Sequence, residues 1–100
     1  MAKRKIIWSV PAKCDLLEIL TFYFSRNGTK IFSRKLNLSL RKTIKLLEKN
    51  PDIGIQTNHQ NIRNLVHDNY YIIYKVNPDT IEILAIWDSR QNPDDLKIKY

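Results

Sequence analysis

Four side chains in the second half of the chain could act together on a phosphodiester: Arg63, His67, Tyr71 and Arg90. Metal-free RNA cleavage uses the 2′-hydroxyl as the nucleophile, and it needs a base, an acid and a cation that stabilises the phosphorane. Arginine supplies such a cation, and histidine titrates near neutral pH. Tyrosine can stack on a nucleobase, but its pKa of about 10 makes it a poor base at neutral pH.

Each of these residues also has a simpler structural interpretation. Arg63 could form a surface ion pair, and Arg90 could pair with Asp88 or Asp94. His67 and His59 fall in predicted turn or loop segments, where a lone histidine is more often solvated. The two histidines are eight residues apart, and the single cysteine lies far upstream. This spacing is not that of a metal site, and we expect neither a metal nor a cofactor.

Positive charge is concentrated in the first half of the chain. Residues 1–50 hold 12 Lys and Arg against three acids, whereas residues 51–100 hold five against seven. Among the bases of the predicted second helix, Arg34, Arg41 and Lys45 lie away from its apolar stripe. A field of one sign attracts polyanions, or an acidic protein that masks it. The alternative is a solvated helix face that only keeps the protein soluble.

The length and composition indicate a single domain over residues 1–100, with a hydrophobic fraction of 43%. Cys14 is the only cysteine, so no internal disulfide can form. No apolar run approaches the roughly 20 residues of a membrane span, and the run after the basic start is too short for a signal peptide. We therefore expect a soluble, cytoplasmic protein with no membrane partner.

Hydrophobic periodicity predicts two helices near the start of the chain. The first should run from Pro11 to Ser25, with Ser9 as its N-cap. The second should run from Thr29 to Lys49, with Thr29 as its cap, and it should form a hairpin with the first. The polar stretch 52–60 carries no periodicity and is predicted to be a loop.

Four β-rich runs predict the strands Lys5–Ser9, Asn61–Val66, Tyr70–Val76 and Thr80–Trp87. The run Tyr70–Val76 is apolar at nearly every position, which suits a strand covered on both faces. The short turns around residues 67–69 and 77–79 make the last three strands an antiparallel meander. The order β-α-α-β-β-β predicts an α+β fold, in which a helical hairpin packs on a small, mainly antiparallel sheet.

Four motifs follow one another along the chain. They are I-I-W-S-x-x-A-K-x-D-L-x-x-I at 6–19, L-L-E-K-N-P-D-I-G at 46–54, the strand pair I-R-x-L…Y-x-I-I-Y-K-V, and the terminal I-x-I-L-A-I-W-D-S-R-Q-N-P. In order and spacing they resemble the RelE/ParE superfamily of bacterial toxins. The resemblance implies the toxin half of a type II toxin–antitoxin pair, a growth inhibitor neutralised by a cognate antitoxin. An apolar groove beside the hairpin or the sheet edge is the expected antitoxin surface.

The resemblance leaves two targets open. RelE-like toxins enter the ribosomal A site and cleave mRNA, whereas ParE-like toxins poison DNA gyrase. RelE-like nucleases, and many ParE relatives, carry Arg at the position of Tyr71, and the loss of that guanidinium removes the best phosphate stabiliser. This departure favours inhibition of gyrase by binding. The alternative is a ribosome-dependent endoribonuclease that uses Arg63, Arg90 and a Tyr or His, so enzymatic activity stays open.

The resemblance also singles out the exit from the last strand, where RelE-like relatives keep their chemistry. Arg90 matches a basic position just after this strand, and Arg63 matches a position that is commonly basic in the family. The remaining residues of the exit are candidates for binding the target: Trp87, Asp88, Ser89, Gln91 and Asn92.

Overall fold

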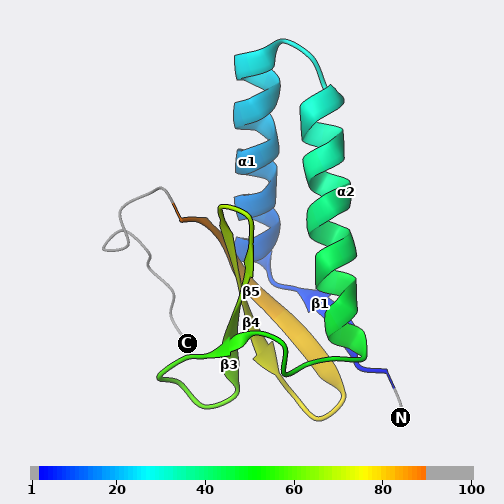
Figure 1. Cartoon of the computed structure of the whole chain (residues 1–100), viewed down its shortest axis with the longest axis vertical. Coiled ribbons are helices and arrows are strands. Elements are labelled where there is room, and N and C mark those ends of the chain that lie inside the picture. Colours follow the sequence, from blue (N-terminus) through cyan, green and yellow to red (C-terminus); the bar gives the residue numbers. More distant parts are fainter. Residues whose placement is uncertain (1–2, 90–100) are drawn as a thin grey trace.

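A computed structural model describes residues 3–89 of the chain (Figure 1). The elements are β1 (Lys5–Trp8), α1 (Val10–Asn27), α2 (Ile31–Lys45), the 3₁₀ helix η1 (Leu46–Glu48), β2 (Ile55–Gln56), β3 (Ile62–His67), β4 (Tyr70–Val76) and β5 (Thr80–Asp88). They form the predicted α+β fold in the predicted order. No helix within residues 3–89 is both long enough and apolar enough to cross a membrane.

Ser9 caps the start of α1 as predicted, whereas the helix ends at Asn27, two residues beyond the predicted end at Ser25. The Ser9 hydroxyl accepts a hydrogen bond from the Ala12 N–H at 3.2 Å, as an N-cap should, and it donates one to the Leu84 carbonyl at 3.1 Å. Gly28 ends the helix with a φ of 71°, and its N–H bonds to the Phe24 carbonyl. A left-handed residue at this position favours glycine. The cap thus also attaches the start of α1 to β5.

The predicted bounds of the second helix were wrong at both ends. Lys30, and not Thr29, precedes the first turn, and no side chain caps it, because the chain is still turning between the two helices over residues 28–30. The α-helix stops at Lys45, and η1 continues it with a tighter winding. Leu47 of η1 is completely buried, so this winding completes the apolar stripe of the helix.

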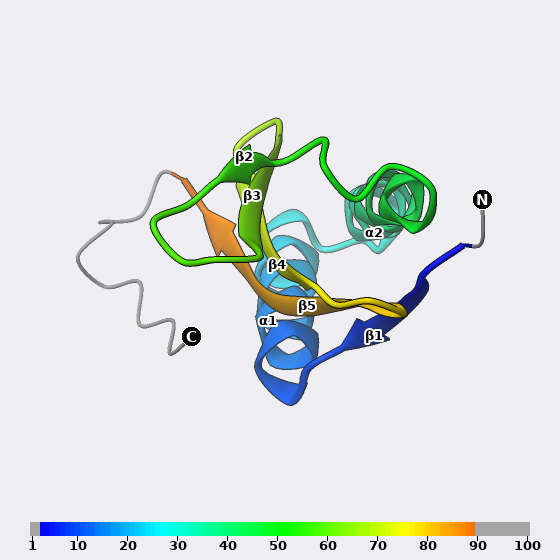
Figure 2. The same cartoon turned by 90° about the horizontal axis from the view of Figure 1, so that it is seen from below.

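The five strands form one mixed sheet in the order β1-β5-β4-β3-β2, which can be followed in Figure 2. β1 runs parallel to β5, and all other pairs are antiparallel. The predicted loop 52–60 contains the strand β2. This strand has only two residues, so its sequence shows no periodicity. The predicted turn at 67–69 is shorter than expected: His67 is still in β3, and Asp68 turns the chain with a φ of 52°.

Two buried clusters lie on the two faces of the sheet. The larger cluster joins both helices to β4 and β5, and its members are Ala12, Leu16, Leu40, Ile44, Leu47, Tyr70, Ile72, Tyr74, Ile81, Ile83 and Ile86. The smaller cluster contains Ile62, Ile73 and Ala85, with Tyr71 and Leu84 packed against it. Successive side chains of β4 alternate between the two faces, and this separates the two sets. A register shift between Ile73 and Tyr74 leaves Leu84 of β5 without a partner on β4. The centre of β4 is therefore covered on both faces, as predicted, whereas Lys75 is exposed.

The helical hairpin is longer than the sheet that it covers. The C-terminal end of α1, the turn at Gly28 and the start of α2 project beyond the strands (Figure 1). The described part of the chain measures 42 × 31 × 22 Å along its principal axes. Large apolar side chains are exposed on the projecting half, including Phe22, Phe24 and Ile31. This half of the hairpin therefore offers surface that the sheet does not bury.

Candidate functional site

The strand register places the predicted catalytic residues on different faces of the sheet. Arg63 is paired with Tyr74 and His67 with Tyr70, and both tyrosines belong to the cluster beneath the helices. Directly paired residues share a face, so Arg63 and His67 lie on the helix side. Tyr71 follows Tyr70 along β4 and points to the other side. Arg63 and His67 are themselves four residues apart on one strand, or about 13 Å.

Arg63 attaches the segment between η1 and β2 to the sheet. One guanidinium nitrogen, Nη1, donates hydrogen bonds to the Gly54 carbonyl at 2.8 Å and to the Asp52 carbonyl at 3.2 Å. The other, Nη2, lies 3.7 Å from the Asp52 carboxylate, and 24% of the Arg63 side chain is exposed. An arginine fork used in this way is no longer free to hold a phosphate. The ion pair suggested as the structural alternative for Arg63 is therefore present.

The Tyr74 hydroxyl holds the same segment from within the core. It donates to the Pro51 carbonyl at 2.7 Å and accepts the Gly54 N–H at 2.9 Å. Burial raises the pKa of Tyr74, against the opposing effects of the Gly54 hydrogen bond and the Arg63 charge. A Cβ on Gly54 would lie 2.6 Å from this hydroxyl, so the close approach requires glycine. The N-P-D-I-G motif is thus explained by the packing of a loop.

His67 joins β3 to α2. Its Nε2 lies 2.8 Å from the Ser39 hydroxyl, and its Nδ1 lies 3.2 Å from the Thr43 hydroxyl. Hydroxyls donate as well as accept, so they can satisfy both ring nitrogens whichever one carries the proton. The Asp68 carboxylate is also 3.7 Å from Nε2. His67 is therefore a contact between β3 and α2, and both of its ring nitrogens are engaged.

Two aromatic residues, Tyr71 and Trp87, lie next to each other on the face of the sheet opposite the helices. They are direct partners in the register of β4 and β5. Both side chains are partly exposed, and the Tyr71 hydroxyl forms no hydrogen bond within residues 3–89. Aromatic rings on a sheet can stack on nucleobases or pack against a protein surface. This face of the sheet could therefore bind a partner through its aromatic rings. The Arg63 guanidinium does not assist, because Arg63 lies on the other face.

The exit from β5 lies against α1. Trp87 and Asp88 line a cleft whose other wall is formed by Asp15 and Glu18 of α1. The Ser89 N–H donates to the Asn69 carbonyl at 2.6 Å, which joins the exit to the β3–β4 turn. The other candidates at this exit are outside the described residues: Arg90, Gln91 and Asn92.

Asp15 joins α1 to the edge of β5, a role that the sequence did not predict. Its Oδ2 accepts the Ile86 N–H at 3.0 Å and so continues the hydrogen bonding of the β5 edge beyond β1. Burial raises the pKa of Asp15, the Ile86 hydrogen bond lowers it, and the nearby Glu18 charge raises it further. The only sequence signal was its place in the A-K-x-D-L motif at 12–16.

The predicted basic surface lies on the outer side of α2. Arg34, Arg41 and Lys45 are all exposed. The Arg41 guanidinium carbon lies 5.2 Å from the centre of the Trp8 ring, and its Nε donates to the Asn37 side chain at 3.0 Å. α2 contains no acid, so its charge is not balanced within the helix. This surface can attract an acidic protein or a polyanion, as the sequence indicated.

Two solved structures share the fold of this chain. The structure titled "Chromosomal ParDE TA system from P. aeruginosa" matches with a TM-score of 0.76 and 21% identity, covering 86% of this chain and 96% of the other. The E. coli DinJ-YafQ toxin-antitoxin complex matches with a TM-score of 0.55 and 14% identity, covering 88% of this chain and 94% of the other. No curated protein sequence matched the chain.

The family model for the ParE toxin of the type II toxin–antitoxin system parDE matches residues 6–93. The chain therefore belongs to the ParE toxin family and is a toxin of the RelE/ParE superfamily. This confirms the resemblance inferred from the four motifs.

Proposed function

We propose that this toxin arrests growth by binding DNA gyrase and that it does so without cutting RNA. The observation that supports this most is the placement of the candidate nuclease residues. Arg63 and His67 are engaged in holding a loop and a helix, and Tyr71 lies on the other face of the sheet. A cleaving site needs its base, acid and cation within hydrogen-bond reach of one phosphate. Binding has no such requirement.

Two surfaces are our candidates for contacting gyrase. One is the basic outer side of α2, with Arg34, Arg41 and Lys45. The other is the exit from β5, with Trp87, Asp88 and Ser89 and the two residues Gln91 and Asn92 beyond the described part. The exit presents a partly exposed Trp87, and tryptophan is enriched among the residues that contribute most to protein interfaces.

The direct test is a supercoiling assay with purified gyrase and micromolar toxin. We expect loss of supercoiling and accumulation of gyrase cleavage complexes. The variant Trp87→Ala should weaken the effect, because it removes the largest apolar group of the exit. Val66→Ala, a change of a partly exposed apolar residue on β3, is the control. If supercoiling and cleavage complexes are unchanged by the wild-type toxin, gyrase is not the target.

Ribosome-dependent cleavage of mRNA is the second candidate, and the partly exposed pair Tyr71 and Trp87 is what favours it. Their rings could stack on a base while Arg90 contacts the phosphate. This mechanism predicts codon-positioned cuts in a translation extract that disappear in Arg90→Ala and in Tyr71→Ala. It would be excluded if the extract shows no cuts. Asking whether replication or translation stops first after induction separates the two candidates in cells.

We also propose that a cognate antitoxin binds this chain in the cytoplasm and masks α2. Both structures named above are toxin–antitoxin systems by title. The five bases of α2, with no acid among them, would suit an acidic antitoxin segment. Co-expression of the neighbouring reading frame should restore growth and allow the two proteins to be purified together. Growth that is unaffected by the toxin alone would instead indicate a chain that has kept only its binding function.

A further inference from the structure

The outer side of α1 carries large apolar side chains that the rest of residues 3–89 leaves exposed. One side of the helix buries Ala12 and Leu16 in the core, whereas Leu17 and Phe22 are 65% and 55% exposed. A surface helix normally has one apolar stripe and a polar opposite face. An apolar outer face of this kind marks an interaction surface. α1 therefore has a second side that is suited to contact another molecule.

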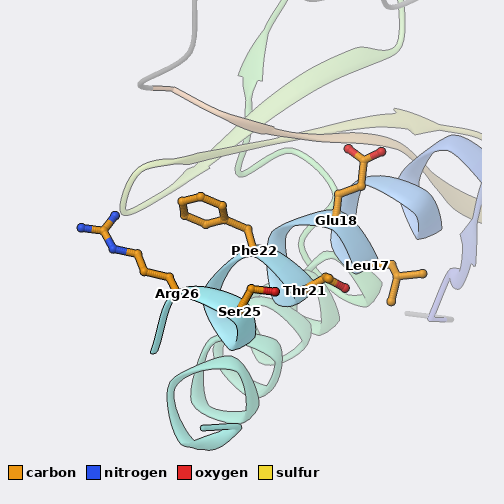
Figure 3. A pocket seen from close by; sticks show the side chains of 6 residues that line it. All are labelled: Leu17, Glu18, Thr21, Phe22, Ser25 and Arg26. Atoms are coloured by element: carbon orange, nitrogen blue, oxygen red, sulfur yellow. The ribbon is translucent and has the colours of Figure 1, made fainter. Parts of the chain in front are cut away.

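The uncovered side forms a shallow, mostly apolar groove (Figure 3). Two rows of residues at four-residue spacing line it: Leu17, Thr21 and Ser25 in one row, and Glu18, Phe22 and Arg26 in the other. Residues four apart lie on the same face of a helix. In the second row an acid and a base therefore stand at equal distances before and after an exposed aromatic ring, and the two charges are about 12 Å apart along the axis.

The charges of this row are available for an intermolecular contact. Neither Glu18 nor Arg26 takes part in an ion pair within residues 3–89. α1 as a whole carries two bases, Lys13 and Arg26, and two acids, Asp15 and Glu18. It is therefore neutral, in contrast to α2. The net charge of α1 therefore does not attract a strongly acidic partner, as that of α2 does.

We propose that α1 is a self-association surface that binds α1 of a second copy of this chain in antiparallel orientation. A twofold axis near Phe22 places the two Phe22 rings against each other. It also places Glu18 opposite Arg26 of the second copy, and Arg26 opposite its Glu18. Such an isologous contact uses one self-complementary patch twice, as most homodimers do. The same symmetry buries the Thr21 and Ser25 side of the groove in both copies.

The test is the oligomeric state of the purified full chain, measured by sedimentation velocity over a series of concentrations. The wild type should dimerise as its concentration rises, and salt should weaken the dimer. Glu18→Arg or Arg26→Glu alone sets like charges opposite each other twice, so each should weaken dimerisation roughly tenfold. The double variant Glu18→Arg/Arg26→Glu restores both pairs with the signs exchanged, and it should dimerise about as well as the wild type.

Two controls make the result interpretable. Lys13→Glu makes the same charge change as Arg26→Glu on the same helix, but Lys13 lies one turn before Leu17 and does not line the groove. This variant should leave dimerisation unchanged. Circular dichroism should show equal helix content in all variants. A chain that is monomeric at every concentration overturns the proposal, and so does a dimer that ignores the charge reversals or is not restored in the double variant.

The antitoxin is the other possible occupant of this groove. If Phe22→Ala and Glu18→Arg abolish antitoxin binding while the toxin alone stays monomeric, the groove belongs to the antitoxin and the proposal is wrong. The oligomeric state is measured without gyrase or ribosomes. Its outcome is therefore independent of whether the proposed target is correct.

Discussion

Two polar side chains of this toxin form hydrogen bonds that could not be predicted from the residue types alone. Arg63, which the family resemblance singled out, donates hydrogen bonds to the Asp52 and Gly54 carbonyls. The Tyr74 hydroxyl donates to the Pro51 carbonyl and accepts the Gly54 N–H. The two side chains act on the same short segment from two directions. Substitutions at either position should therefore be read first as changes in stability.

Tyr74→Phe should destabilise the fold by about 1–3 kcal/mol, because it leaves the buried Gly54 N–H without an acceptor. Tyr71→Phe is the matched control. It makes the same change on the same strand, but the hydroxyl it removes has no hydrogen bond within residues 3–89. Urea denaturation of the two variants measures the difference. Equal stabilities would show that the Tyr74 hydroxyl does not hold the loop.

Asp15→Asn should stabilise the fold relative to the wild type, and it should do so by more at pH 7 than at pH 4. Burial raises the pKa of Asp15 above its usual 3.8, so the folded state binds its proton more tightly than the unfolded state. The stability from this proton is fully present below pH 3.8 and is lost as the pH rises through the raised pKa. Asparagine keeps an oxygen for the Ile86 N–H but carries no charge. Its advantage over the wild type should therefore grow between pH 4 and pH 7.

Urea denaturation at both pH values tests this dependence. Asp15→Ala is the reference, because it also removes the acceptor and should cost about 1–3 kcal/mol at pH 7. An advantage of Asp15→Asn that is the same at both pH values would show that the Asp15 charge does not affect folding.

At the scale of elements, side-chain contacts attach each helix to the sheet. Ser9 bonds the start of α1 to the Leu84 carbonyl, and Asp15 bonds the next turn to Ile86. His67 bonds β3 to Ser39 and Thr43 of α2. These contacts orient the hairpin, whose apolar stripes supply most of the burial. The orientation of α2, and with it the direction of its basic face, depends on His67.

His67→Ala should destabilise the fold by about 1–2 kcal/mol, because two hydroxyls on α2 lose their partner. Combining it with Thr43→Val should cost less than the sum of the two single changes, since both remove the same contact. Thermal or urea denaturation of the three variants gives the coupling energy. Additive effects would mean that the ring and the Thr43 hydroxyl do not interact in solution.

Across the whole molecule, charge divides the two helices of the hairpin. α2 carries five bases and no acid, whereas α1 is neutral and apolar on its outer side. The division suggests that the two helices serve different partners. An acidic partner is steered to α2 by the long-range field, while a contact on α1 depends on apolar burial and matched charges.

The double change Arg34→Glu/Lys45→Glu should slow association with the antitoxin roughly tenfold at low salt, and the difference should shrink as salt is added. Lys5→Glu/Lys75→Glu changes the net charge equally at exposed positions on the sheet, and it should have a smaller effect. Stopped-flow association rates over a salt series test the prediction. If the two double variants slow binding equally, only net charge matters, and α2 is not the antitoxin surface.

Much of the fold could be predicted because it is written in local patterns. Apolar periodicity predicted α1, and Ser9 marked its start correctly. β2 escaped prediction because two residues carry no period, and the end of α2 was misplaced because a 3₁₀ turn continues the same apolar stripe. The candidate site was harder. Types and spacing named Arg63, His67 and Tyr71, but not which of them share a face.

By itself, the sequence determined the order of the elements, the family and the uneven distribution of charge, since these depend on periodicity, motifs and composition. The tertiary structure alone decided what the side chains do. Strand register set Arg63 and His67 toward the helices and Tyr71 away from them, and hydrogen bonds to Gly54, Ser39 and Thr43 then engaged the first two. The physical reason is that these partners lie between 9 and 28 residues away in the chain. Only folding brings them within reach.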